Sequence, residues 1–263
     1  MKNNCFLGSA VLLIVLFTSA GSLYAQKKEQ PVPEKLNDAQ VTERLSYIEN
    51  ALYTAQPHAQ GWWYSWMAIY GSATIVQGTL AGHHWNDWKH DYRAYPRKIR
   101  NRAFAEDMLI GGCTTALGVG GLLITPFKSA YLPDRLRHMS ANTPAERQAK
   151  LLQAEDILRQ CAEVEADGWG WMPHVLNLVV NMGAGLTTVL AFKRPWIDGL
   201  IVFAESEAVS LVNIFSQPRK NVRNLRNYEE KYKGRAKGGA YNPYENEVFL
   251  TIVPGGIGVG MKF

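Results

Sequence analysis

Four long segments with few or no charged side chains constrain this chain more than any other feature. Segments 62–82, 108–127 and 175–192 carry no charged residue, and segment 198–215 carries three acidic residues. A helix needs about 20 mainly apolar residues to cross a bilayer, so each segment is about long enough. The pattern predicts a mainly α protein whose four apolar helices form membrane-associated helical hairpins.

Two further segments, within 33–52 and 143–166, have the spacing of amphipathic helices, with apolar residues recurring three or four positions apart. Their apolar faces comprise Val41, Leu45, Ile48 and Leu52 in the first and Leu151, Ala154, Leu158 and Cys161 in the second. Thr143 and Glu146 are spaced as a capping box, and Pro144 stands at the first helical position. The second helix is therefore expected to begin at this proline.

The two halves of the sequence resemble each other weakly. Residues 44–52 match residues 150–158 at an offset that also pairs Trp63 with Trp169. This match predicts a two-fold internal repeat, each unit being an amphipathic helix followed by an apolar hairpin. Short apolar windows also match by chance, and that reading remains open.

The first residues have the layout of a cleavable secretory signal. Lys2 precedes an apolar run at 6–17, and small residues lead up to Ala25. We therefore expect the protein to be exported and residues 1–25 to be removed.

The last residues predict a short β-hairpin with a turn at Pro254, because apolar residues alternate with small or polar ones up to the C-terminus. The ending resembles the C-terminal signal of bacterial outer-membrane barrels, which finish on phenylalanine. Gly258, Met261 and Phe263 carry this resemblance. It implies the outer membrane, although residues 60–220 lack the repeated strand-length segments of a complete barrel.

These features predict the domain organisation and the location of the chain. The expected order is a signal peptide at 1–25, an amphipathic N-terminal helix within 26–60, a helical membrane domain at 61–218 with an inserted amphipathic helix at 143–166, a basic linker at 219–247 and a β-hairpin at 248–263. The location is a cell-envelope membrane. The outer membrane is slightly favoured over the inner one, because a four-span inner-membrane topology would place the basic segment outside, against the positive-inside rule.

The segment 83–102 has two interpretations. Imidazoles and carboxylates four, seven and eight positions apart lie on one helix face and are the ligand types of a zinc or iron site; they are His83, Asp87, His90 and Asp91. Alternatively, aromatic and basic side chains form a membrane-interface anchor, comprising Trp85, Trp88, Tyr92, Arg97 and Lys98. The aromatic and basic content favours the anchor, so we expect no metal or other cofactor.

A stripe of polar side chains follows the third and fourth apolar segments. It comprises His174, Asn177 and Asn181 in one, and Ser206, Glu207, Ser210 and Asn213 in the other. A short link makes the two helices antiparallel neighbours, so the stripes are expected to meet. They either line a hydrophilic pathway or hold the helices together by hydrogen bonds, and the second interpretation is favoured.

The basic segment 219–247 is expected to be a solvated linker, with anionic lipid or lipopolysaccharide as its alternative ligand. Nucleic acid is not an expected partner of an exported protein. Nucleophile and zinc-protease motifs are absent from the sequence. The prediction is a non-enzymatic bacterial envelope membrane protein with a structural or assembly role, or one forming a small channel as a homo-oligomer in the lipid bilayer. The alternative is a metal-dependent hydrolase that acts on envelope lipid or polymer through the 83–91 cluster.

Overall fold

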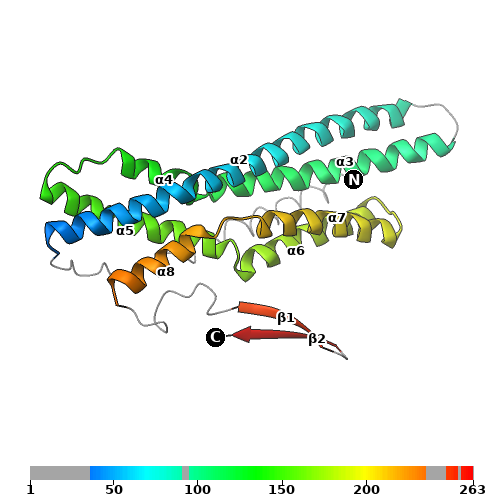
Figure 1. The fold of residues 1–263 in the computed structure, drawn as a ribbon. Helices are drawn as coiled ribbons and strands as arrows, with labels where there is room; N and C mark the ends of the chain where they lie inside the picture. The colour runs from blue at the N-terminus through cyan, green and yellow to red at the C-terminus, as the bar shows by residue number, and fades with distance from the viewer. Residues whose placement is uncertain (1–35, 91–94, 235–246, 254–255, 263) are drawn as a thin grey trace, which may run out of the picture. The chain divides into compact units, whose positions relative to one another are not determined.

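A computed structural model describes residues 36–90, 95–234, 247–253 and 256–262, with side chains described for 36–85 and 100–234. The fold is mainly helical, as predicted. Its helices are α2 (Asp38–His90), α3 (Tyr95–Ile124), α4 (Lys128–Arg137), α5 (Pro144–Asp167), α6 (Trp171–Leu186) with its π-helical extension η1 (Thr187–Ala191), α7 (Trp196–Phe215) and α8 (Lys220–Tyr232) (Figure 1). The predicted signal peptide and Phe263 lie outside the described residues. In the 83–102 segment, nothing is described of residues 91–94, and no side chain is described from 86 to 99.

Helix α2 joins two segments that were expected to be separate helices, the N-terminal amphipathic helix and the first apolar helix. It begins after Asn37, whose side chain accepts a hydrogen bond from the backbone N–H of Gln40 at 2.8 Å while the Gln40 side chain accepts one from Asn37 at 3.0 Å. Pro57 stands inside the helix without ending it. A proline removes one backbone hydrogen bond, and packing of α2 on both sides of this position keeps the two parts continuous.

The first part of α2 packs with α4, α5 and α8 in a helical bundle (Figure 1). All eight apolar residues predicted to lie on the two amphipathic faces are buried. Helix α5 begins as predicted, with the Thr143 side chain accepting from the Glu146 N–H and Pro144 at the start. The 3.6-residue spacing of apolar side chains therefore identified both bundle faces correctly.

The basic segments that follow α3 and α7 are both helical, although the segment from residue 219 was expected to be a linker. Helix α4 buries Leu132 and Leu136, and helix α8 buries Leu225 and Tyr228. Residues 220–232 are thus part of the bundle, and the prediction of a linker from residue 219 was wrong there. The basic side chains of α8 obscured a narrow apolar face, which is buried only because α5 and α2 are present to cover it.

The remaining helices form two antiparallel pairs, α2 with α3 and α6 with α7 (Figure 1). Glycines bring the backbones close: a Cβ atom at Gly112 would lie 3.4 Å from the backbone nitrogen of Gly78, and one at Gly185 would lie 2.6 Å from the carbonyl oxygen of Gly199. Small residues allow this approach in membrane helices, where dispersion contacts replace the hydrophobic effect.

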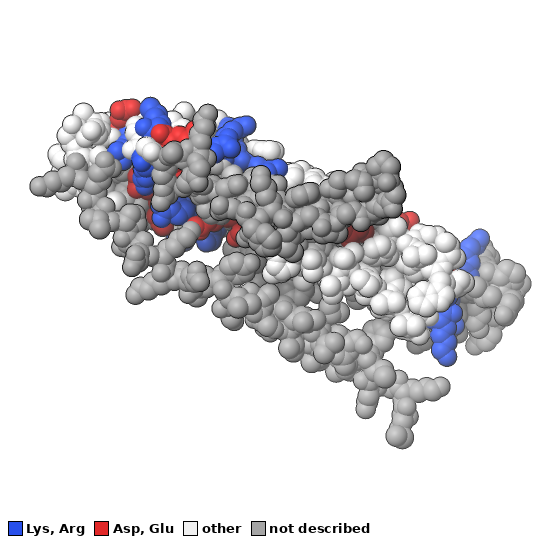
Figure 2. Space-filling view, turned by 90° about the horizontal axis from the view of Figure 1, so that it is seen from below, with Lys and Arg blue, Asp and Glu red and all other residues white. Residues whose placement is uncertain are grey.

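Three helical segments are long and apolar enough to cross a membrane, namely Arg100–Arg137, Trp171–Ala191 and Trp196–Tyr232. The first predicted apolar segment, 62–82, is uncharged but is not among them, because tyrosine, serine, threonine, glutamine and glycine lower its hydropathy. Figure 2 shows charged side chains gathered at one end of the described helices, mostly uncharged surface beyond them, and Lys and Arg again at the far end. Large apolar side chains are exposed along α6 and α7, among them Val179, Leu190 and Leu200.

Two strands lie near the C-terminus, β1 (Glu247–Val253) and β2 (Gly256–Lys262), paired antiparallel with Leu250 opposite Val259. No side chain is described in either strand, and the C-terminal Phe263 is outside the described residues. The β-hairpin and its resemblance to an outer-membrane signal stay predictions. The internal repeat also stays a prediction, although an amphipathic helix, an antiparallel apolar pair and a short basic helix follow one another in each half.

Candidate functional site: polar groups within the apolar helices

Three residues of the predicted polar stripe meet between α6 and α7. The Asn181 side-chain amide donates to the carboxylate of Glu207 at 2.8 Å and to the hydroxyl of Ser210 at 3.0 Å. Asn181 and Ser210 are buried, and Glu207 is half-buried. Polar groups in a low-dielectric setting are stable when they pair with one another, so this cluster holds the two helices in register.

The other members of the stripe take different positions. His174 packs its ring against Phe215 at a centroid distance of 5.9 Å. The Asn213 carbonyl accepts a hydrogen bond from the Trp62 indole at 3.3 Å, while the Asn213 side-chain nitrogen is buried with no partner among the described residues. Asn177 and Ser206 are half-buried. Part of the stripe therefore joins α6 to α7, and Asn213 contacts α2 instead.

A second carboxylate, Glu205, points away from this cluster. It shares the exposed face of α7 with Ile201, Ala204, Ala208 and Val212, one to two turns apart. No hydrogen bond or ion pair joins Glu205 to another residue in the part of the chain that the structure describes. In the sequence it is one of the three acidic residues of segment 198–215 and belongs to no predicted stripe. A helical projection distinguishes it from Glu207, since two positions along a helix turn the side chain by about 200°.

Arg194, in the turn between η1 and α7, connects the two helical pairs. Its guanidinium bonds Asp198 at 2.9 Å, Asp107 of α3, and the Ala103 carbonyl at 3.4 Å. Asp198 is in the first turn of α7, whereas Asp107 lies well inside α3 and serves as a partner for this arginine.

Tryptophan side chains mark the junction between the bundle and the apolar pairs. The indoles of Trp62 and Trp66 each donate to the Ser216 hydroxyl at 3.1 Å. The Trp169 indole donates to the Gln217 carbonyl at 3.2 Å. Helix ends leave carbonyl groups without helical partners. The Trp169 indole satisfies one such carbonyl just beyond the end of α7, while Trp62 and Trp66 bond the Ser216 hydroxyl at the same helix end.

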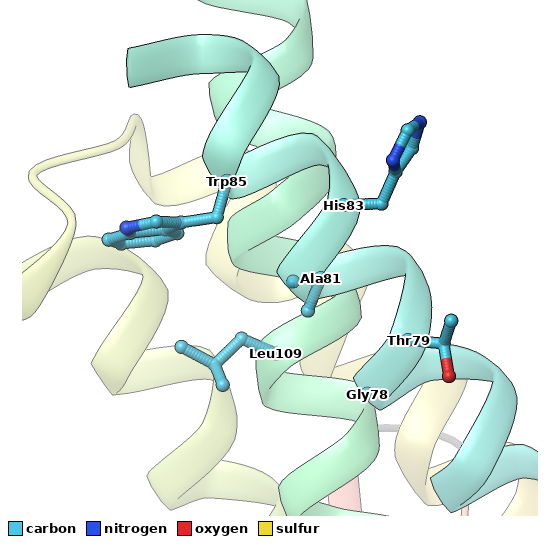
Figure 3. A pocket seen from close by; sticks show the side chains of 7 residues that line it. Gly78, Thr79, Ala81, His83, Trp85 and Leu109 are labelled. Carbon is cyan, nitrogen blue, oxygen red and sulfur yellow. The ribbon is translucent and has the colours of Figure 1, made fainter. Parts of the chain in front are cut away.

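The 83–102 segment contains the end of α2 and the start of α3. A shallow, open groove of about 920 Å³ adjoins the start of this segment and is lined by Gly78, Thr79, Ala81, Gly82, His83, Trp85 and Leu109. Figure 3 shows Trp85 and Leu109 on one side of α2, with His83 and Thr79 projecting on the other. The lining diverges and does not converge on one point.

Among the residues of the metal and anchor predictions, side chains are described only for His83 and Trp85. His83 is exposed and Trp85 is half-buried. The remaining predicted residues, Asp87, Trp88, His90, Asp91, Tyr92, Arg97 and Lys98, lie outside the described side chains. Within the described part of the chain, no three His, Cys, Asp or Glu side chains come together as metal ligands would.

A buried carboxylate in the bundle was not anticipated from the sequence. Glu165 of α5 accepts hydrogen bonds from the backbone N–H and the side-chain amide of Asn221, both at 2.7 Å. Asn221 lies in the first turn of α8, whose own preceding residue provides no side-chain cap. Burial raises the pKa of Glu165 from its ordinary 4.5 to about 7, against the opposing effect of hydrogen bonds from Ser129 and Asn221. Glu165 thus caps a helix far away in the sequence.

No protein-family model, curated protein or solved structure matches this chain. The function is therefore argued from the geometry above.

Proposed function

We propose that this chain is a non-enzymatic envelope membrane protein with a structural or assembly role. In this proposal both helical pairs cross a lipid bilayer, and the bundle of α2, α4, α5 and α8 lies at one membrane surface. The observation that carries the proposal is the exposed apolar surface of α3, α6 and α7. Soluble proteins rarely expose so large an apolar surface to water.

The lengths of the helices support a full crossing. Helix α7 has 20 residues and therefore a length of about 30 Å, the thickness of a bilayer hydrocarbon core. Trp62 and Trp85 are about 34 Å apart along α2 by the same helical rise, and Trp171 and Trp196 begin α6 and α7 at opposite ends of their pair. Tryptophan is enriched at both membrane interfaces, and these positions correspond to the two sides.

Helix α2 crosses together with α3 in this proposal, despite its lower hydropathy. Its polar groups face its partner: the Thr74 hydroxyl bonds the Thr115 hydroxyl at 3.0 Å, and Thr115 also bonds Gln77 at 3.4 Å. Gly118 lies against the ring of Tyr70 further along the pair. Because α3 covers these groups, α2 presents a more apolar surface to lipid than its composition indicates.

The same geometry favours a structural role over a pathway inside one molecule. Asn181 of α6 donates to both Glu207 and Ser210 of α7, so the three side chains are not arranged around a continuous water-filled passage. The channel version of the prediction therefore requires several copies. Conductance of reconstituted vesicles that stays at baseline would remove it.

Export and the choice of membrane belong to the proposal as well. The N-terminal signal pattern supports export, and the C-terminal strand pattern supports the outer membrane. The hydropathy of α3 favours retention in the inner membrane instead. Separation of the two membranes on a density gradient decides between them, and mass spectrometry of the purified protein should find Gln26 as the first residue.

The direct test of the proposal is topological. Single cysteines at Gln153, exposed on α5, and at Lys193, exposed in the α6–α7 turn, are introduced after Cys5, Cys113 and Cys161 are replaced by serine. An impermeant maleimide applied to sealed membranes should label one of the two positions, and both after detergent is added. Labelling of both positions from the same side would overturn the proposed crossing.

The alternative, a metal-dependent hydrolase, depends on a cluster of which only the His83 side chain is described. Metal analysis of the purified protein tests it directly. Less than about a tenth of an equivalent of bound zinc or iron would end this alternative, because a catalytic site requires near-stoichiometric metal.

A further inference from the structure

The exposed face of α7 places a carboxylate where lipid is expected. This outer α7 face comprises Ile201, Ala204, Glu205, Ala208 and Val212. Glu205 is the tenth of the helix's 20 residues and so lies near the middle of the proposed crossing. A carboxylate at this depth is costly in lipid and is stable only with a partner.

We propose that the outer α7 face is the contact between two copies of this chain, with the two Glu205 carboxyl groups hydrogen-bonded to each other across a two-fold axis along the membrane normal. This inference rests on the proposed membrane crossing. In such an isologous pair the same residue of each copy meets at the same depth. A protonated carboxyl group is both donor and acceptor, so it is complementary to another copy of itself.

The sequence leaves no cationic alternative within a second copy. Segments 62–82, 104–127, 171–192 and 195–218 contain no lysine or arginine, and their one histidine, His174, lies in the first turn of α6 and so near a helix end. The basic residues nearest to these segments, such as Arg194 and Lys220, lie at the helix ends. A second copy therefore offers Glu205 no ion-pair partner at its own depth, whereas it does offer the matching carboxyl group.

The neighbours of Glu205 permit the necessary approach. Ala204 and Ala208 stand four positions apart on the same exposed face, the small-xxx-small spacing that lets membrane helices pack closely. Large apolar residues, Ile201 and Val212, continue the face on both sides and are 49% and 59% exposed. The outer α7 face thus has small residues at its centre, which allow close packing, next to a carboxyl group that requires a hydrogen-bond partner.

The test is oxidative cross-linking of the full chain in lipid vesicles. Cys5, Cys113 and Cys161 are replaced by serine, and Ala208→Cys is introduced on the outer α7 face. Val179→Cys, exposed at a similar depth on α6, is the matched control. A disulfide-linked dimer is expected for Ala208→Cys and not for Val179→Cys, since a disulfide requires the two Cα atoms to lie within about 7 Å.

Substitutions of Glu205 then separate the hydrogen bond from mere proximity. In the Ala208→Cys background, Glu205→Gln retains a donor and an acceptor and should preserve the dimer, whereas Glu205→Val should reduce it by about tenfold. Glu207→Gln, on the opposite face, should leave it unchanged. Dimer that is equal in Glu205→Val, or absent in Ala208→Cys, overturns the inference. Flotation with the vesicles is checked in each case, and a chain that does not float overturns the proposed crossing itself.

Discussion

At the residue scale, the bundle contains a buried carboxyl group whose pKa is raised well above its ordinary value. Glu165 is fully buried, and burial raises its pKa to about 7. Its two hydrogen bonds from Asn221 offset part of the desolvation and cap α8. The protonation state of this one side chain is therefore coupled to the docking of a whole helix.

The stability of the bundle should fall as the pH rises through this range. Because the folded state binds the Glu165 proton more tightly than the unfolded state, this contribution is fully present below pH 4.5 and is lost as the pH passes about 7. The loss is roughly 3 kcal/mol at most, at about 1.4 kcal/mol per pKa unit. Glu165→Gln is neutral at every pH and should remove this slope. Thermal unfolding of both proteins in detergent between pH 4.5 and 8 measures it, and parallel slopes would refute the assignment.

At the element scale, the α6–α7 pair depends on the absence of two side chains. A Cβ atom at Gly185 would lie 2.6 Å from the Gly199 carbonyl oxygen, and one at Gly199 would lie 2.7 Å from the Gly185 carbonyl oxygen. Backbone atoms cannot rotate away from such a contact. The π-helical turn η1 begins two residues after Gly185, so any displacement there also reaches the Arg194 turn.

Gly185→Ala is expected to destabilise the protein by about 1 to 3 kcal/mol, the usual range for overpacking. Gly183→Ala makes the same chemical change in the same helix, but its added methyl group meets nothing within 4 Å. The control should be neutral or slightly stabilising, because alanine favours helices more than glycine does. The midpoint of thermal unfolding in detergent compares the two. An equal effect of both variants would show that the close approach is unimportant.

Arg194 is the second element-scale contact, because it bonds both α3 and α7. We expect Arg194→Ala to cost about 1 to 2 kcal/mol, a modest figure because the ion pairs are partly exposed. Lys193→Ala, the exposed neighbour, is the control and should change little. Limited proteolysis near residues 192–195 provides a second readout: faster cleavage is expected for Arg194→Ala alone. Equal cleavage rates would place the connection between the helical pairs elsewhere.

At the scale of the whole molecule, the two environments of the chain should be visible in its own cysteines. Cys161 is buried in the bundle, where burial raises its thiol pKa to about 12. Cys113 is exposed on α3, within a segment apolar enough to span a membrane. One thiol is therefore shielded by protein and the other, under the proposed crossing, by lipid.

The wild-type mature protein in intact membranes should accordingly resist a water-soluble maleimide, since the reactive species is the thiolate. Complete labelling of both cysteines is expected after denaturation in sodium dodecyl sulfate, and mass spectrometry counts the adducts. Rapid labelling of Cys113 in intact membranes would contradict the crossing by α3. Rapid labelling of Cys161 would contradict the bundle core.

The sequence by itself determined the features that depend on near neighbours along the chain. These are the apolar segments, the two amphipathic faces, and the start of α5 at Thr143 and Pro144. Each follows from helical periodicity or from a hydrogen bond three residues away, so local spacing is sufficient to predict it. Helical spacing also predicts a polar face on α6 and on α7, and the short link between these helices predicts that the two faces meet.

Only the tertiary structure decided how distant groups pair. It joined two predicted helices into α2, recruited the basic segment 220–232 into the bundle as α8, and brought Glu165 to the start of that helix. It also separated Glu207, bonded to Asn181, from Glu205 on the outer face. The role of a carboxylate depends on which helices pack over it. Those helices lie tens of residues away in the sequence, so a local pattern cannot predict the role.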